Sequence, residues 1–176
     1  MTPLYRASSA GHTDIVRLLS AKSRNLNHAD DRGVTALHIA SKKRYAAIVE
    51  ILCNAGALRD VTTNEGKTPL WLASAEGDAV TVGCLLGYNA QVDSADQHGI
   101  TPLLISSYHG HGDVVRALLA KGADVNRVRD NGISPLIIAS YRGHEEIVRL
   151  LGDAGADVLY RSPASPNSRT ISSCPR

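Results

Sequence analysis

Apolar residues recur along most of the chain as short stripes with the spacing of a helix. The pair Ile15-Val16 is followed by Leu18-Leu19, so apolar side chains occupy positions i, i+1, i+3 and i+4, which form one face of an amphipathic helix. The same stripe returns at Ile48-Val49, Val114-Val115 and Ile147-Val148, each followed by a second apolar pair. Polar stretches separate the stripes, and the pattern therefore predicts several short helices, each buried along one face.

A second, shorter helix is predicted ahead of each stripe. Five segments with Leu two residues after a Thr or Ser start 33 residues apart, at Thr2, Thr35, Thr68, Thr101 and Ser134. A Thr or Ser hydroxyl is a good N-cap, and four of these segments place Pro at the first helical position, where a backbone N–H is not needed. In four copies a Gly nine residues further on can take the left-handed conformation that ends a helix, which limits the first helix to about two turns.

The repeating unit resembles the ankyrin repeat. The segment Thr35-Ala36-Leu37-His38-Ile39-Ala40 is close to the family's T-P-L-H-x-A signature, and residues 122–126 match its repeat end. The resemblance implies an all-α fold, an ankyrin-repeat solenoid of stacked helix-turn-helix units with projecting β-turn fingers, over residues 1–160. The first of the five repeats lacks its finger. Stacking is physically required because one unit cannot bury its apolar stripe alone.

Some positions depart from the repeat. Gly83 lies inside the predicted second helix of the third copy, and Arg6 replaces an aliphatic residue. The dipeptide Arg44-Tyr45 stands where other copies have Gly-His. The first and last copies keep the apolar pattern of the internal copies, whereas terminal repeats usually carry a polar outer face. We therefore expect flanking repeats or a partner to cover the two ends.

Three residues are candidates for modification. Residues 161–176 are rich in Ser, Pro and Arg and are expected to be disordered, since they offer little apolar area to bury. Within them, Ser162 and Ser165 each precede Pro and resemble proline-directed phosphorylation sites, with an inert tail as the alternative. The stretch from Leu118 to Asn126 resembles the ankyrin-repeat sites that an asparaginyl hydroxylase modifies, which implies Asn126 as the acceptor.

Composition and charge exclude several classes of protein. A net charge of +2 provides no strong attraction to nucleic acid or to an anionic membrane. No apolar run approaches the roughly 20 residues of a membrane span, and no signal peptide is evident. The three cysteines lack a metal-ligand spacing, and Cys53 and Cys84 are interpreted as small core residues. We expect a cytoplasmic or nuclear protein with reduced thiols.

No catalytic, cofactor or metal site emerges from the motifs. Gly66-Lys67-Thr68 resembles the end of a phosphate-binding loop, but Val61 occupies the place of the required upstream glycine. His12, His111 and His144 repeat at the Gly-His position, which gives them an architectural explanation. The remaining histidines lack Cys or carboxylate ligands at a suitable spacing. We therefore expect no enzyme activity, no cofactor and no bound metal.

Ankyrin proteins usually bind partners through the finger tips and the exposed end of the first helix, and the resemblance implies the same surface here. The candidate residues are Arg32, Lys42, Lys43, Glu65, Lys67, Glu76, Tyr88, His98, Ile100, Tyr108, His109, Asn131, Ile133, Tyr141 and Arg142. Tyr108 and Tyr141 are equivalent positions one repeat apart. Because Tyr and Arg are frequent hot spots, we predict a groove with an aromatic centre and a basic flank, against the alternative of a solvated face.

Three functions remain open at this point. The leading hypothesis is a module or scaffold that binds another protein and carries no chemistry of its own. The second is a recruiting or regulatory segment of a larger enzyme or channel. The third is nucleic-acid or nucleotide binding through Lys42, Lys43 and Arg142, which the near-neutral charge and the lack of a basic stripe disfavour.

Overall fold

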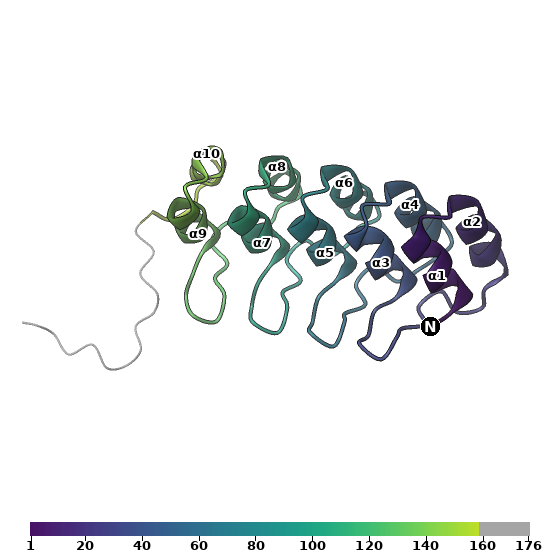
Figure 1. The fold of residues 1–176 in the computed structure, drawn as a ribbon. Coiled ribbons are helices and arrows are strands. Elements are labelled where there is room, and N and C mark those ends of the chain that lie inside the picture. The colour runs from purple at the N-terminus through teal and green to yellow at the C-terminus, as the bar shows by residue number, and fades with distance from the viewer. Residues whose placement is uncertain (159–176) are drawn as a thin grey trace, which may run out of the picture.

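The computed structural model describes residues 1–158, which form ten α-helices and no β-strand (Figure 1). The helices are α1 (Pro3–Ala10), α2 (Thr13–Lys22), α3 (Ala36–Lys42), α4 (Ala46–Asn54), α5 (Pro69–Glu76), α6 (Ala79–Gly87), α7 (Pro102–His109), α8 (Gly112–Ala120), α9 (Pro135–Arg142) and α10 (Glu145–Asp153). The predicted all-α solenoid is confirmed. The predicted tail at 161–176, with Ser162 and Ser165, lies outside the described residues.

Each first helix begins at the predicted N-cap. The hydroxyl oxygen of the cap accepts a hydrogen bond from the backbone N–H three residues further on, at 3.1–3.4 Å. The five caps are Thr2, Thr35, Thr68, Thr101 and Ser134. This bond satisfies one of the N–H groups that a helix leaves without a partner in its first turn. A cap every 33 residues therefore sets the register of the whole stack.

The first helices end as predicted, with one informative exception. Gly77 follows α5 with a φ of +75°, the left-handed conformation that an L side chain rarely adopts. Arg44 takes the equivalent position after α3 with a φ of +63°. The Arg44 guanidinium donates a hydrogen bond to the carbonyl of Glu76, at the end of α5. A contact with the next repeat thus accompanies the strained backbone at Arg44.

The helices stack in two rows. Figure 1 shows α1, α3, α5, α7 and α9 side by side in one row, α2, α4, α6, α8 and α10 in the other, and the fingers projecting from the first row. Between the rows lies a continuous core of small aliphatic side chains such as Leu37, Leu70, Val82 and Val115. Leu and Val allow thin layers to approach closely, which is consistent with the absence of Phe from the sequence.

Rings on the first helices tie each repeat to the next finger. Nε2 of His38 lies 3.1 Å from the carbonyl oxygen of Lys67, and Nε1 of Trp71 donates to the carbonyl of Ile100 at 2.9 Å. Both rings are buried, which confirms the prediction that Trp71 lies between repeats. Burial also lowers the pKa of His38 below its ordinary value of 6.5. The His38 ring is therefore neutral at physiological pH.

The fingers are hairpin-like and hydrogen-bonded to one another. Within the first finger, the backbone N–H of Asp30 donates to the carbonyl of Val34 at 3.0 Å. Between fingers, the N–H of Asn64 donates to the carbonyl of Arg32 at 2.9 Å, and the N–H of Gln97 to that of Glu65 at 3.1 Å. These bonds hold the finger tips in a fixed row beside the first helices.

Both cysteines in the described part of the chain belong to the helical core. Cys53 is buried and Cys84 is half-buried, and both thiols are free, as expected for small core residues. Burial raises the pKa of Cys53 to about 11. Over residues 1–158, no helix has the length and apolarity that a membrane span needs.

Candidate functional site

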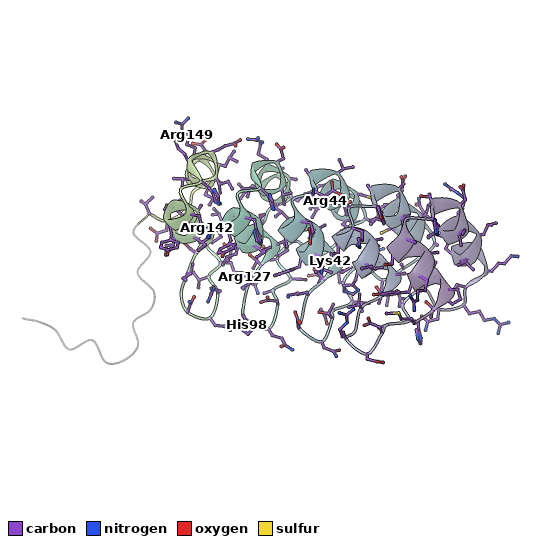
Figure 2. All side chains as sticks on the ribbon, in the orientation of Figure 1. Lys42, Arg44, His98, Arg127, Arg142 and Arg149 are labelled. Carbon is purple, nitrogen blue, oxygen red and sulfur yellow. The ribbon has the colours of Figure 1, made fainter. Side chains whose placement is uncertain are left out.

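The candidate surface is the finger face, defined here as the finger tips together with the exposed sides of α1, α3, α5, α7 and α9. Figure 2 shows Lys42 and Arg142 beside helices of the first row and His98 on a finger. Lys42, Lys43 and Arg142 are exposed, and the caps and apolar stripes of the repeat do not use them. The finger face is therefore free to vary without disturbing the stack.

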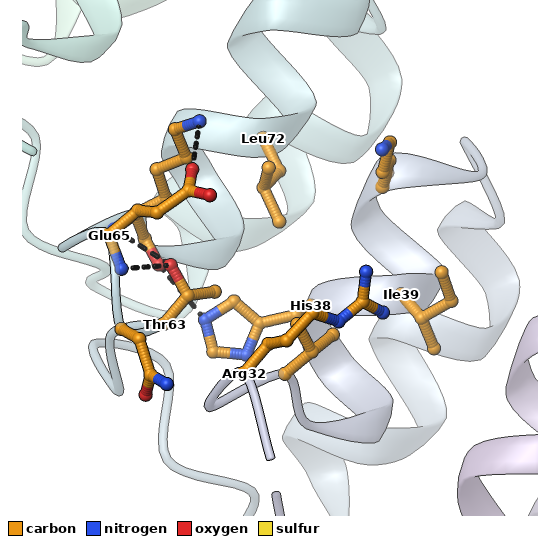
Figure 3. A pocket seen from close by; sticks show the side chains of 10 residues that line it. Arg32, His38, Ile39, Thr63, Glu65 and Leu72 are labelled. Carbon is orange, nitrogen blue, oxygen red and sulfur yellow. Dashed lines mark hydrogen bonds and ion pairs between the residues drawn. The ribbon is translucent and has the colours of Figure 1, made fainter. Parts of the chain in front are cut away.

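A pocket of about 250 Å³ opens on this face between the first two fingers and helices α3 and α5 (Figure 3). Val34, Ile39 and Leu72 provide apolar lining. The polar lining residues are Arg32, His38, Lys42, Thr63, Asn64, Glu65 and Lys67. Four of the predicted partner-binding residues, Arg32, Lys42, Glu65 and Lys67, thus come together around one cavity.

The charges around the pocket are only partly neutralised. Nζ of Lys67 lies 2.5 Å from a carboxylate oxygen of Glu65 and 4.7 Å from the centre of the Trp71 ring. The hydrogen bond from Lys67 lowers the pKa of Glu65. Arg32 pairs with Asp30 at 3.2 Å, whereas Lys42 forms no ion pair with any described residue. The pocket therefore offers an apolar lining beside an uncompensated ammonium group.

A second group of side chains on the finger face surrounds the end of α7. The Arg142 guanidinium lies 4.5 Å from the centre of the Tyr108 ring, a cation–π contact between α9 and α7. The His109 ring meets Tyr108 edge-on at 5.0 Å and stacks on His111 at 5.7 Å. We call Tyr108, His109, His111 and Arg142 the aromatic cluster. It lies in the C-terminal half, where the sequence predicts an aromatic centre.

The electrostatics of the aromatic cluster favour a neutral His109. Burial lowers the pKa of His109, and the neighbouring His111 and Arg142 lower it further, while Glu76 acts in the opposite direction. Nε2 of His111 lies 3.1 Å from the carbonyl oxygen of Ala75, so its ring fills the junction between repeats. At neutral pH, Arg142 is therefore the main positive charge of the cluster.

The other predicted residues lie at several places. His98 and Asn131 are exposed on fingers, and Ile100 and Ile133 are half-buried at the finger bases, where their backbones close the hairpins. Lys43 is exposed next to Lys42 at the end of α3. Tyr141 is 83% exposed, and no ring or cation of the described residues packs against it, in contrast to Tyr108. The prediction of paired tyrosines thus becomes a Tyr108–Arg142 pair with Tyr141 beside it.

Tyr88 requires a correction. It follows α6, and its hydroxyl donates a hydrogen bond at 2.8 Å to the side-chain oxygen of Asn54, the last residue of α4. It therefore belongs to the row of second helices rather than to the finger face. The prediction was wrong because position in the repeat was used to assign a side, whereas the ends of the second helices pack against one another.

Asn126 is exposed after α8 and takes part in a ladder between repeats. Its side-chain oxygen accepts a hydrogen bond from the backbone N–H of Asp157 at 2.8 Å. Asn27 accepts in the same way from the N–H of Leu58, and Asp60 from that of Gln91. Asn126 thus has a structural role, and its hydroxylation stays a prediction.

Sequence reasoning missed two groups of residues that shape the site. Ile39 and Leu72 were interpreted as framework positions, yet both are half-buried and line the pocket. His111 was given an architectural role, and it also supports His109. The available signal was the position of Arg6, which shows that this site in the repeat accepts a charged side chain. No group of His, Cys, Asp and Glu within the described residues could hold a metal ion.

These features define a stacked-helix repeat protein with an exposed finger face. Profiles of ankyrin repeats match nearly the whole chain: one built from three copies matches residues 55–129 and 81–162, one of many copies matches 18–73, and a single-repeat profile matches 1–31. The chain belongs to the ankyrin-repeat family. Ankyrin repeats are generally protein–protein interaction modules. A search of curated proteins finds no match.

Proposed function

We propose that this chain is a non-catalytic interaction module that holds a segment of a partner protein against the finger face. The observation that carries the proposal is the pocket between the first two fingers. It combines apolar lining from Ile39 and Leu72 with the uncompensated Lys42 on a face that the framework leaves free. A concave site with apolar walls and a few placed polar groups is the usual form of a binding site. Reduced thiols at Cys53 and Cys84 support a cytoplasmic or nuclear location.

The chemistry of the finger face favours an acidic segment with an apolar anchor. At the pocket, Lys42 and Arg32 would attract a carboxylate while the aliphatic lining takes an apolar stem. At the aromatic cluster, Tyr108 and Arg142 offer contact area together with hydrogen-bond donors, the combination that dominates binding hot spots. A partner that reaches both sites would gain affinity from each and would be oriented along the fingers.

The test is a selection of peptides displayed from a natural proteome, followed by affinity measurement. Labelled binding peptides would be titrated with the full chain by fluorescence polarisation. We expect the variants Lys42→Glu, Tyr108→Ala and Arg142→Ala each to raise Kd by about tenfold or more. Arg116→Ala is the matched control, because it removes the same side-chain type as Arg142→Ala from the row of second helices.

The outcome decides between a used and an unused finger face. Peptides enriched in Asp or Glu next to aliphatic residues, with an affinity that falls as salt rises, agree with the proposal. If Arg116→Ala abolishes binding while the three finger-face variants bind normally, the partner uses another surface and the proposal is wrong. Melting curves of each variant separate a loss of binding from a loss of folding.

A further inference from the structure

The N-terminal end of the stack exposes a side chain that every internal repeat buries. Ile15 of α2 is 47% exposed, whereas the equivalent Ile48 and Ile147 are each 1% exposed and Val114 is fully buried. Leu18, on the same helix, is 64% exposed. Among the described residues, nothing stacks on this side of α1 and α2. We call Leu18, Ile15, His12 and Asp14 the leading face.

The opposite end exposes the complementary side of the same junction. Ile137 of α9 is 41% exposed, whereas the equivalent Leu104 is 2% exposed. Gly143, which follows α9, has no described atom within 4 Å of the place where a Cβ would stand. Arg149, on α10, pairs only with Glu145 of its own helix. We call Ile137, Gly143 and Arg149 the trailing face.

Internal junctions show how such faces fit together. The ring of His111 covers Gly77, and the ring of His144 covers Gly110. In each case Nε2 of the histidine lies 3.1 Å from a carbonyl oxygen two residues before that glycine. His12 is the histidine at this position in the first repeat, and its ring has no hydrogen-bond partner among the described residues. The stack thus leaves one histidine without a glycine and one glycine, Gly143, without a histidine.

Charge follows the same register. Arg116 of α8 forms an ion pair at 2.8 Å with Glu146 of α10, across the junction of the last two repeats. One repeat further on, the arginine is Arg149. In the first repeat, the acidic residue that corresponds to Glu146 is Asp14, because the two positions lie four periods of 33 residues apart. A first repeat placed after the fifth would therefore bring Asp14 to Arg149 with opposite charges.

We propose that two copies of this chain stack head to tail, with the leading face of one on the trailing face of the other. The His12 ring of the second copy covers Gly143 and directs Nε2 toward the carbonyl of Tyr141, as His144 does toward Tyr108. Asp14 of the second copy pairs with Arg149, and its Ile15 becomes buried. The two faces differ, so each joined pair still offers one free face at either end, and longer chains grow as concentration rises. This association uses the ends of the solenoid and is independent of the finger face.

The test is sedimentation velocity of the full chain from about 1 μM to about 1 mM, a range that spans weak association. We expect the weight-average sedimentation coefficient to rise with concentration. Leu18→Glu blocks the leading face and Ile137→Glu the trailing face, and burial of an unpaired carboxylate should weaken association by at least about tenfold in each case. Val80→Glu is the matched control, because Val80 is an equally exposed apolar residue on α6, away from both ends.

Mixing the two blocked variants identifies the geometry. Leu18→Glu retains its trailing face and Ile137→Glu retains its leading face, so each alone stays monomeric, whereas an equimolar mixture forms one dimer that grows no further. In addition, Asp14→Arg weakens association about fivefold, and combining it with Arg149→Asp restores it.

The proposal is overturned if the wild type sediments as a monomer over the whole range. It is also overturned if Ile137→Glu alone still dimerises, because that result would indicate a symmetric contact between two leading faces. Circular dichroism melts show whether each variant remains folded, and substitutions at these exposed positions should leave the melting temperature nearly unchanged.

Discussion

The junction between repeats allows a quantitative test at Gly77. A Cβ added there would lie 2.5 Å from Nδ1 of His111, closer than real side chains approach, and the φ of +75° disfavours any L side chain. Gly122 provides the matched control. Its φ is +80°, but no described atom lies within 4 Å of an added Cβ. The two substitutions to Ala therefore share the backbone strain and differ in the clash with the ring.

The expected difference follows from this comparison. The left-handed conformation costs an Ala about 1–2 kcal/mol, and the loss of unfolded-state entropy returns about 0.4–1 kcal/mol at both sites. At Gly77 the His111 ring must also move, which breaks its hydrogen bond to the Ala75 carbonyl and its contacts with the glycine. The free energy of unfolding of Gly77→Ala should therefore fall by about 1–3 kcal/mol more than that of Gly122→Ala.

Urea unfolding followed by far-ultraviolet circular dichroism measures these differences. In a His111→Ala background the clash is absent, and Gly77→Ala should then cost no more than Gly122→Ala. Such a double-mutant cycle isolates the coupling between the glycine and the ring. Equal losses for Gly77→Ala and Gly122→Ala, or a coupling near zero, would refute the view that the histidine ring locks the junction.

Three further outcomes test the core and its titrating groups. Leu70→Ala should lower the free energy of unfolding by about 2–5 kcal/mol in the same assay, since Leu70 is fully buried; a loss below about 1 kcal/mol would contradict a tight core. The pKa of His38 is lower in the folded chain than its ordinary 6.5, so the unfolded chain binds more protons and the melting temperature should fall as pH drops from about 7 to about 5. His38→Trp, which introduces the indole that Trp71 has at the equivalent position, should reduce that acid sensitivity, and an unchanged pH slope would exclude His38 as its source. The thiol of Cys53, with a pKa of about 11, should react slowly with iodoacetamide at neutral pH until urea unfolds the chain, and fast labelling of the folded chain would show an open core.

The sequence by itself determined the stack. N-caps such as Thr68, helix-ending glycines such as Gly77 and the apolar stripes act over a few residues, so their consequences can be derived from local physical chemistry. The 33-residue period then carries one local solution to every repeat. The inter-repeat position of Trp71 followed for the same reason, because equivalent positions in a solenoid have equivalent neighbours.

Only the tertiary structure decided which side chains of different repeats meet. The period places Arg142 and Tyr108 on adjacent helices, but the 4.5 Å contact between them depends on rotamers and on the tilt between layers. The pocket beside Lys42 arises in the same way, from two fingers and two helices that are distant in sequence. Tyr88 was misplaced because the ends of the second helices form a layer of their own. Local patterns fix where each helix begins and ends, whereas surface chemistry depends on distances between layers that no single repeat contains.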